Sequence, residues 1–229
     1  MKKIIYMAAT VLLTTSCFHV NTNWNGGKNV IKGEGAVITK SFDLSGFDEI
    51  LINGHADAVF TQSDTFEVAL TAQENIFDHV DYRVEGTTLI LETKDKRGVR
   101  SESYDIVLKA PSLKRVTVNG ASDFKIPAGL ASEDDLRIEV NGAGDLSFNQ
   151  IRCGNLTIQA NGAADIDATS LQVQDLSIQV NGAGDVRASG VVAGDASLEV
   201  NGAGDIDAEK LQVAGKVNKH AAGIARIKI

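Results

Sequence analysis

Apolar and polar residues alternate strictly in short segments of the second half of the chain. Leu176 to Val180 reads Leu-Ser-Ile-Gln-Val, and Ala196 to Val200 reads Ala-Ser-Leu-Glu-Val. Alternation with a period of two is typical of a β-strand that buries one face. Because no segment between these runs has the 3.6-residue apolar spacing of a substantial helix, the pattern predicts an all-β fold.

A five-residue motif follows each run and recurs at a fixed distance. Asn-Gly-Ala-Gly-Asp, with Ala at the fourth position in one copy, repeats every twenty residues at 141–145, 161–165, 181–185 and 201–205. Looser copies begin at Asn119 and Asn53. A fixed period of this length indicates a solenoid, in which no unit buries its apolar face alone. We therefore predict a β-solenoid (β-helix-like) with coils of about 20 residues and corners formed by the motif.

The twenty-residue step aligns apolar residues into columns that we expect to face inward. Before the motif the columns are Leu136, Leu156, Leu176 and Ala196; Ile138, Ile158, Ile178 and Leu198; and Val140, Ala160, Val180 and Val200. After the motif they are Leu146, Ile166, Val186 and Ile206, and then Ile151, Leu171, Val191 and Leu211. Cys153 aligns with Val173, Ala193 and Val213, which predicts a buried thiol.

The motif has an architectural explanation that needs no ligand. Glycine at its second and fourth positions allows positive φ at a tight corner, and stacked Asn side chains can form a hydrogen-bonded ladder. Stacked Asp side chains repel by roughly 1 kcal/mol per pair even in water, so backbone N–H groups or a cation must satisfy them. Calcium is the alternative that this column leaves open. No metal-ligating residue is assigned.

The first half of the chain has the same character with less regularity. Alternating runs at 49–60, 66–72, 88–93 and 104–110 predict strands, and 75–80 predicts a single helical turn. The basic segment 94–103 is interpreted as a solvated loop, and 224–229 as a cap on the stack.

The N-terminus reads as an export signal. Met-Lys-Lys precedes the short apolar run 4–13, and Thr14, Thr15 and Ser16 precede Cys17. This order resembles a bacterial lipobox, which makes Cys17 the predicted lipid attachment site; ordinary signal cleavage near a cysteine is the alternative. We predict a lipoprotein signal peptide at 1–16, a flexible Asn- and Gly-rich tether at 17–33 and a solenoid domain at 34–229, irregular over 34–117 and regular over 118–229.

The net charge and the cysteine content limit which molecules the protein can bind and which disulfides it can form. The 229 residues include 22 basic and 30 acidic side chains, for a net charge of −8. Because no basic run is available to neutralise phosphates, nucleic acid is excluded as a partner. With Cys17 lipidated, Cys153 has no partner for a disulfide.

Several segments together resemble a known family. Ser41-Phe42-Asp43-Leu44-Ser45-Gly46-Phe47-Asp48-Glu49-Ile50, the segments 53–62 and 110–114 and the motif series resemble the putative auto-transporter adhesin, head GIN domain family from about Glu34 onward. Members more often carry Ser at the first corner position, where this chain has Asn. The resemblance implies a β-solenoid-like fold and a bacterial envelope protein, often a lipoprotein, with a surface-adhesion role.

The expected function is therefore binding without catalysis. The region 119–216 contains only Phe124 and Phe148 as aromatic residues and no histidine, although sugar-cleaving sites combine carboxylates with stacking aromatics. Acid pairs such as Asp165 with Asp167 recur on successive coils, whereas a catalytic site is single.

We predict an outer-membrane lipoprotein, periplasmic or surface-facing, with no catalytic residue and no cofactor. The membrane is the partner of its lipid, and a glycan or protein is the partner of its flat rows Glu139, Gln159, Gln179 and Glu199. A calcium-stabilised structural envelope protein and a polysaccharide-active β-helix enzyme are the alternatives.

Overall fold

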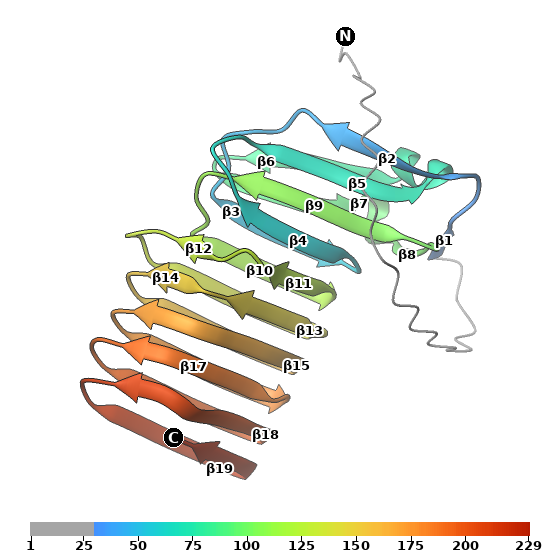
Figure 1. Ribbon diagram of the computed structural model, residues 1–229. Coiled ribbons are helices and arrows are strands. Elements are labelled where there is room, and N and C mark those ends of the chain that lie inside the picture. Colours follow the sequence, from blue (N-terminus) through green and yellow to red (C-terminus); the bar gives the residue numbers. More distant parts are fainter. Residues whose placement is uncertain (1–29) are drawn as a thin grey trace.

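The computed structural model describes residues 30–229, which form a stack of coils below an irregular N-terminal head (Figure 1). The predicted signal peptide and lipid attachment site Cys17 lie outside the described residues. The regular stack comprises β10 (Arg115–Ala121), β11 (Asp123–Ile126), β12 (Leu130–Ala131), β13 (Leu136–Asn149), β14 (Ile151–Cys153), β15 (Leu156–Val173), β16 (Leu176–Ala183), β17 (Val186–Val192), β18 (Ala196–Val213) and β19 (Val217–Lys228). The predicted all-β solenoid is confirmed.

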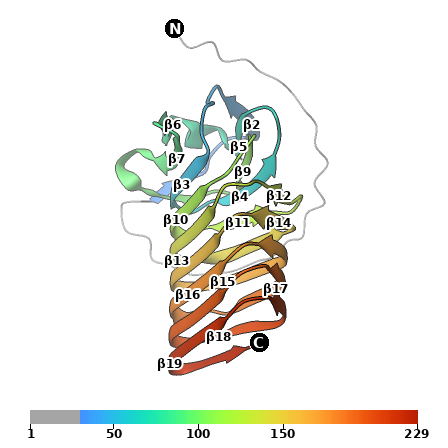
Figure 2. The same ribbon diagram turned by 90° about the vertical axis from the view of Figure 1, so that its left-hand side faces the viewer.

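Parallel pairing between successive coils follows the repeat. Leu136 lies opposite Leu156, Leu156 opposite Leu176, and Leu176 opposite Ala196, so each coil stacks on the one before it in register. The segments before the motif form one face of the solenoid, which we call the front face. The segments after the motif form the back face. A third side consists of β12, β14 and the end of β15 (Figure 2).

The core lies between these faces and consists of the predicted columns. The three columns before the motif and the first column after it are buried throughout. The last predicted column is wrong at Val191, which is 47% exposed, while Val192 is fully buried. The register slips after Ala168, so Gly190 lies opposite Leu171 and Val192 opposite Val173. A spacing count cannot detect this slip, because the full unit still has twenty residues.

The head continues both faces with less regular strands. It comprises β1 (Val30–Lys32), β2 (Val37–Phe42), β3 (Glu49–Gly54), β4 (Asp57–Gln62), β5 (Glu67–Gln73), the 3-10 turn η1 (Glu74–Asp78), β6 (Val80–Glu85), β7 (Thr88–Thr93), η2 (Lys94–Lys96), β8 (Gly98–Arg100) and β9 (Tyr104–Ala110). On the front, β3 pairs in parallel with β7 and β10; on the back, β4 pairs with β9 and β11. The antiparallel strands β6, β5 and β2 extend these faces away from the stack.

Two segments of the head differ from the sequence interpretation. The basic segment expected to be a loop contains β8, and β8 pairs with β1, which lies inside the segment predicted as tether. Ile31 of β1 is 3% exposed, so its side chain anchors this part of the chain to the core. Three-residue strands carry too little periodicity to be recognised in a sequence. None of the helices in residues 30–229 has the length and apolarity needed to cross a membrane.

Candidate binding surface

The motif bends the chain, and in three of its six copies the strand continues through the bend. β13, β15 and β18 run continuously through it, so the predicted tight corner is an extended segment. Glycine at the second position has positive φ in every copy, as in Gly162 at 140°. At the fourth position, Gly144 has positive φ at 152°, but Gly184 and Gly204 do not have it. The expectation for two positive-φ glycines per motif is therefore wrong for these two copies.

Glycine at the second position is also required by the neighbouring coil. A Cβ on Gly162 would lie 2.0 Å from the carbonyl oxygen of Gly142, and one on Gly182 would lie 2.1 Å from that of Gly162. Atoms cannot approach so closely, so these glycines let adjacent coils stack through backbone contact. The bend is thus fixed in position on every coil, and the polar side chains beside it are aligned.

The first motif residue forms the predicted Asn ladder. The Nδ2 of each asparagine donates to the Oδ1 of the asparagine one coil nearer the head, at 2.9–3.1 Å, along Asn201, Asn181, Asn161, Asn141, Asn119 and Asn53. All amides point the same way, so their dipoles add and each bond polarises the next.

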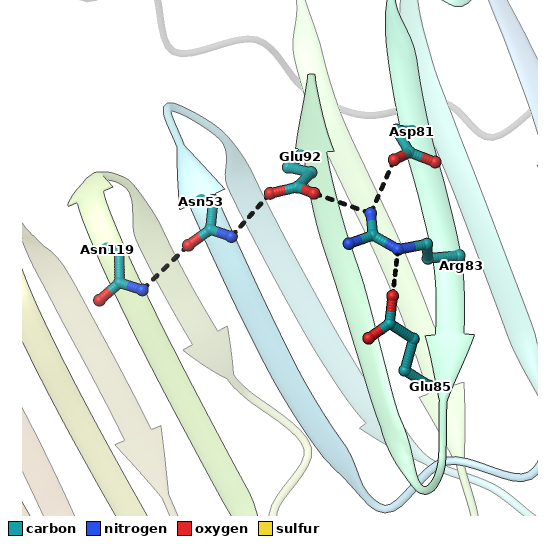
Figure 3. Close-up of polar contacts among 6 residues, drawn as sticks. All are labelled: Asn53, Asp81, Arg83, Glu85, Glu92 and Asn119. Atoms are coloured by element: carbon teal, nitrogen blue, oxygen red, sulfur yellow. Dashed lines mark hydrogen bonds and ion pairs between the residues drawn. The ribbon is translucent and has the colours of Figure 1, made fainter. Parts of the chain in front are cut away.

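The ladder ends at a carboxylate, which accepts the hydrogen bond that its last amide donates (Figure 3). The Nδ2 of Asn53 donates to Glu92 Oε2 at 2.9 Å, and Glu92 Oε1 accepts from Arg83 at 2.7 Å. Arg83 also pairs with Asp81 and Glu85. The hydrogen bonds from Arg83 and Asn53 hold the pKa of Glu92 below its usual value. The sequence did not reveal this end group, because Glu92 belongs to no copy of the motif.

A row of longer polar side chains runs beside the Asn ladder on the front face. Glu139, Gln159, Gln179 and Glu199 lie in register on successive coils; we call them the Gln/Glu row. Asn141 and Asn201 donate to Glu139 and Glu199, and Arg137 donates to Gln159 at 2.9 Å. Several side chains of the row are thus held in place. With Thr157, Ser177 and Ser197 beside it, the row forms a regular surface of hydrogen-bonding groups about 4.8 Å apart.

The back face carries a column of aspartates. Asp123, Asp145, Asp165, Asp185 and Asp205 stack along it, and pairing in the head extends the column to Asp57 and Asp105. The backbone N–H groups of Asp145, Asp185 and Asp205 donate to the preceding carboxylates at 2.9–3.0 Å, and Arg226 lies 3.4 Å from Asp205. The sequence analysis predicted that either backbone N–H groups or a cation satisfies these carboxylates. Backbone N–H groups do so in part of the column.

The stacked carboxylates of the column still repel one another, and burial together with this repulsion raises the pKa of two of them. Partial burial, followed by the charges of Asp123 and Asp165, raises the pKa of Asp145. Burial and then Asp123 raise the pKa of Asp57. In residues 30–229, no three His, Cys, Asp or Glu side chains have an arrangement that could hold a metal ion.

The other residues considered for binding or catalysis are buried or have partners within the protein. Phe124 and Phe148 are at most 1% exposed, so neither is available for stacking on a sugar. Asp167 pairs with Arg187 at 3.2 Å, and the Nδ1 of His55 lies 2.6 Å from the carbonyl oxygen of Ala121. Cys153 is 8% exposed, as predicted, and burial raises the pKa of its thiol to about 11. Its neighbour across β15 and β17 is Val192 and not Ala193, because of the register slip.

The fold and its surface rows are those of an adhesin-like β-solenoid. The family described as putative auto-transporter adhesin, head GIN domain, matches residues 46–229, and the chain belongs to this family. No curated protein matches the chain.

Several solved structures have the same fold. A putative adhesin from Bacteroides fragilis is 21% identical, with a TM-score of 0.67 over 86% of this chain and 99% of its own. A putative adhesin from Parabacteroides distasonis is 22% identical, with a TM-score of 0.74 over 86% of this chain and 84% of its own. A putative lipid binding protein from the same species is 23% identical, with a TM-score of 0.73 over 87% of this chain and 100% of its own.

Proposed function

We propose that the protein is a non-enzymatic adhesion module of the cell envelope, anchored in the outer membrane by lipid on Cys17, and that its front face binds a glycan or protein. Family membership supports an envelope adhesin, and the order of residues 1–17 supports the lipid. The observation that carries the binding surface is the Gln/Glu row, in which Glu139, Gln159 and Glu199 are held in place by hydrogen bonds from the Asn ladder and Arg137.

The front face suits recognition because three of the four side chains of its Gln/Glu row are hydrogen-bonded before a partner arrives. Binding costs the entropy of every side chain that must be immobilised, and a fixed row avoids part of that cost. The back face offers mainly carboxylates, which favour cations and repel acidic surfaces. We therefore place the contact on the front face.

The binding surface is tested with paired variants in whole-cell attachment. Ser177→Arg with Gln179→Arg adds two bulky charges to the front face, where neither side chain has a partner. Ser147→Arg with Gln172→Arg adds the same charges to exposed positions elsewhere. Cells carrying the first pair should lose most attachment to glycan-coated or protein-coated surfaces, and cells carrying the second should keep it. Equal attachment by both sets would refute the assignment.

The anchor is tested separately with Cys17→Ser. The full chain should incorporate radiolabelled fatty acid and partition with membranes, and the variant should do neither. A variant that stays in the membrane fraction would show that another segment holds the protein there.

A further inference from the structure

The last described coil of the solenoid has one edge that no described strand covers. β19 pairs with β18 along its length, from Val217 opposite Ala196 to Lys228 opposite Asp207. No other strand of residues 30–229 pairs with its second side, which lies at the end of the stack away from the head (Figure 1). The backbone N–H and C=O groups on that side can therefore accept a further strand.

The side chains of β19 differ from those of the coils above. Lys219 stacks on Leu198, in a column that is otherwise Ile138, Ile158, Ile178 and Leu198. Ile224 is 87% exposed and Val217 is 38% exposed. The end of the stack thus combines exposed apolar groups with an exposed lysine, at a position that is apolar on the coils above.

The charge of this end is opposite to that of the whole chain. Every charged side chain from 210 onward is basic, namely Lys210, Lys216, Lys219, Arg226 and Lys228, although the chain has a net charge of −8. The Asp column ends on Arg226, and Lys228 lies opposite Asp207. The other outermost front strand, β6, carries Asp81 and Glu85 around Arg83. An acidic strand is therefore attracted to β19 and less so to β6.

We propose that β19 is a docking edge for an extended acidic segment of a partner protein, which adds to the solenoid as a further strand. Backbone hydrogen bonds supply affinity in this mode, and side chains supply specificity. Carboxylates on one face of the added strand would lie opposite Arg226 and Lys228, which share a side of β19, at the distance where cross-strand charge pairs interact. The same basic side chains repel the β19 edge of a second copy, so the edge discriminates against self-association. This site is separate from the front face.

Hydrogen exchange on the full chain in non-ionic detergent tests the proposal. The probe is a synthetic twelve-residue peptide that alternates valine and glutamate, and its control alternates valine and lysine. The glutamate peptide should slow exchange of β19 amides at least tenfold, and salt should weaken this protection. The lysine peptide should have no effect.

Two variants of equal charge change localise the effect. Arg226→Glu with Lys228→Glu, on one side of β19, should abolish protection by the glutamate peptide and create protection by the lysine peptide. Lys125→Glu with Arg152→Glu, at exposed positions away from β19, should leave both results unchanged. Protection at β6 or β2 instead of β19, no protection at all, or a dimer of the free chain that protects β19 would each overturn the proposal.

Discussion

At the scale of single residues, glycine at the second motif position meets two independent requirements. Gly162 combines a φ of 140° with a carbonyl oxygen 2.0 Å from where its Cβ would lie. Gly54, at the same motif position in the head, has a φ of 124° and open space around it, so it meets only the first requirement. The two positions therefore separate backbone strain from coil-to-coil contact.

We predict that Gly162→Ala lowers the free energy of unfolding by about 3 kcal/mol or more, since strain and overpacking add. Gly54→Ala should lower it by less, about 1–2 kcal/mol, the cost of backbone strain alone. Urea unfolding measures both. Equal losses in the two variants would mean that coil contact does not constrain Gly162.

Asp145 gives a residue-scale prediction with a pH dependence. Its neighbours Asp123 and Asp165 disfavour its charged form, so Asp145→Asn should raise the free energy of unfolding at pH 7 by about 0.5 kcal/mol, a small value because the side chain is exposed. The folded state binds the Asp145 proton more tightly than the unfolded chain does. The advantage of the variant should therefore shrink as pH falls through the raised pKa, and should also shrink in high salt. An advantage that grows on acidification would contradict this.

At the scale of elements, the Asn ladder joins coils whose backbones are already paired. Asn161→Ala leaves Asn181 without its acceptor and Asn141 without its donor, at half-buried positions. We predict a loss of about 1–2 kcal/mol in the free energy of unfolding. Ser177→Ala, on the same face with no side-chain partner, should cost less than about 0.5 kcal/mol. Thermal or urea unfolding compares the two variants. If Asn161→Ala left the free energy of unfolding unchanged, the ladder would not contribute to stability.

Elements also show what a sequence can predict here. The period, the strands of the regular coils, the buried columns, the Asn ladder and buried Cys153 follow from alternation and the twenty-residue step. The slip at Val191, the strands β1 and β8, and the ladder's end at Glu92 do not follow, because they depend on pairings between segments that share no pattern. The candidate surface was predictable as a row of side chains, but its hydrogen-bonded order was not.

At the scale of the whole molecule, each coil contacts chiefly the coils above and below it. Such an array should tolerate removal of one complete unit. Deletion of residues 156–175 joins Asn155 to Leu176 and places Leu176, Ile178 and Asn181 directly on Leu136, Ile138 and Asn141.

We predict that this deletion gives a folded, shorter solenoid of lower stability with the same β circular dichroism spectrum. Deletion of 156–165 removes half a coil and places strands of one face beneath those of the other, so this variant should fail to fold. Size-exclusion chromatography and circular dichroism distinguish the outcomes. A twenty-residue deletion that unfolds the chain would show that the coils are not interchangeable.

The account centres on the front face as the contact surface, and cysteine accessibility on attached protein tests this most directly. Gln179→Cys and Ser147→Cys place one reactive thiol on the front and back faces, while buried Cys153, with its pKa of about 11, should react about a hundredfold more slowly than an ordinary thiol. On cells bound to their target surface, the thiol at position 179 should become inaccessible to a maleimide reagent and the thiol at 147 should stay reactive. Protection at 147 with free reaction at 179 would contradict the account.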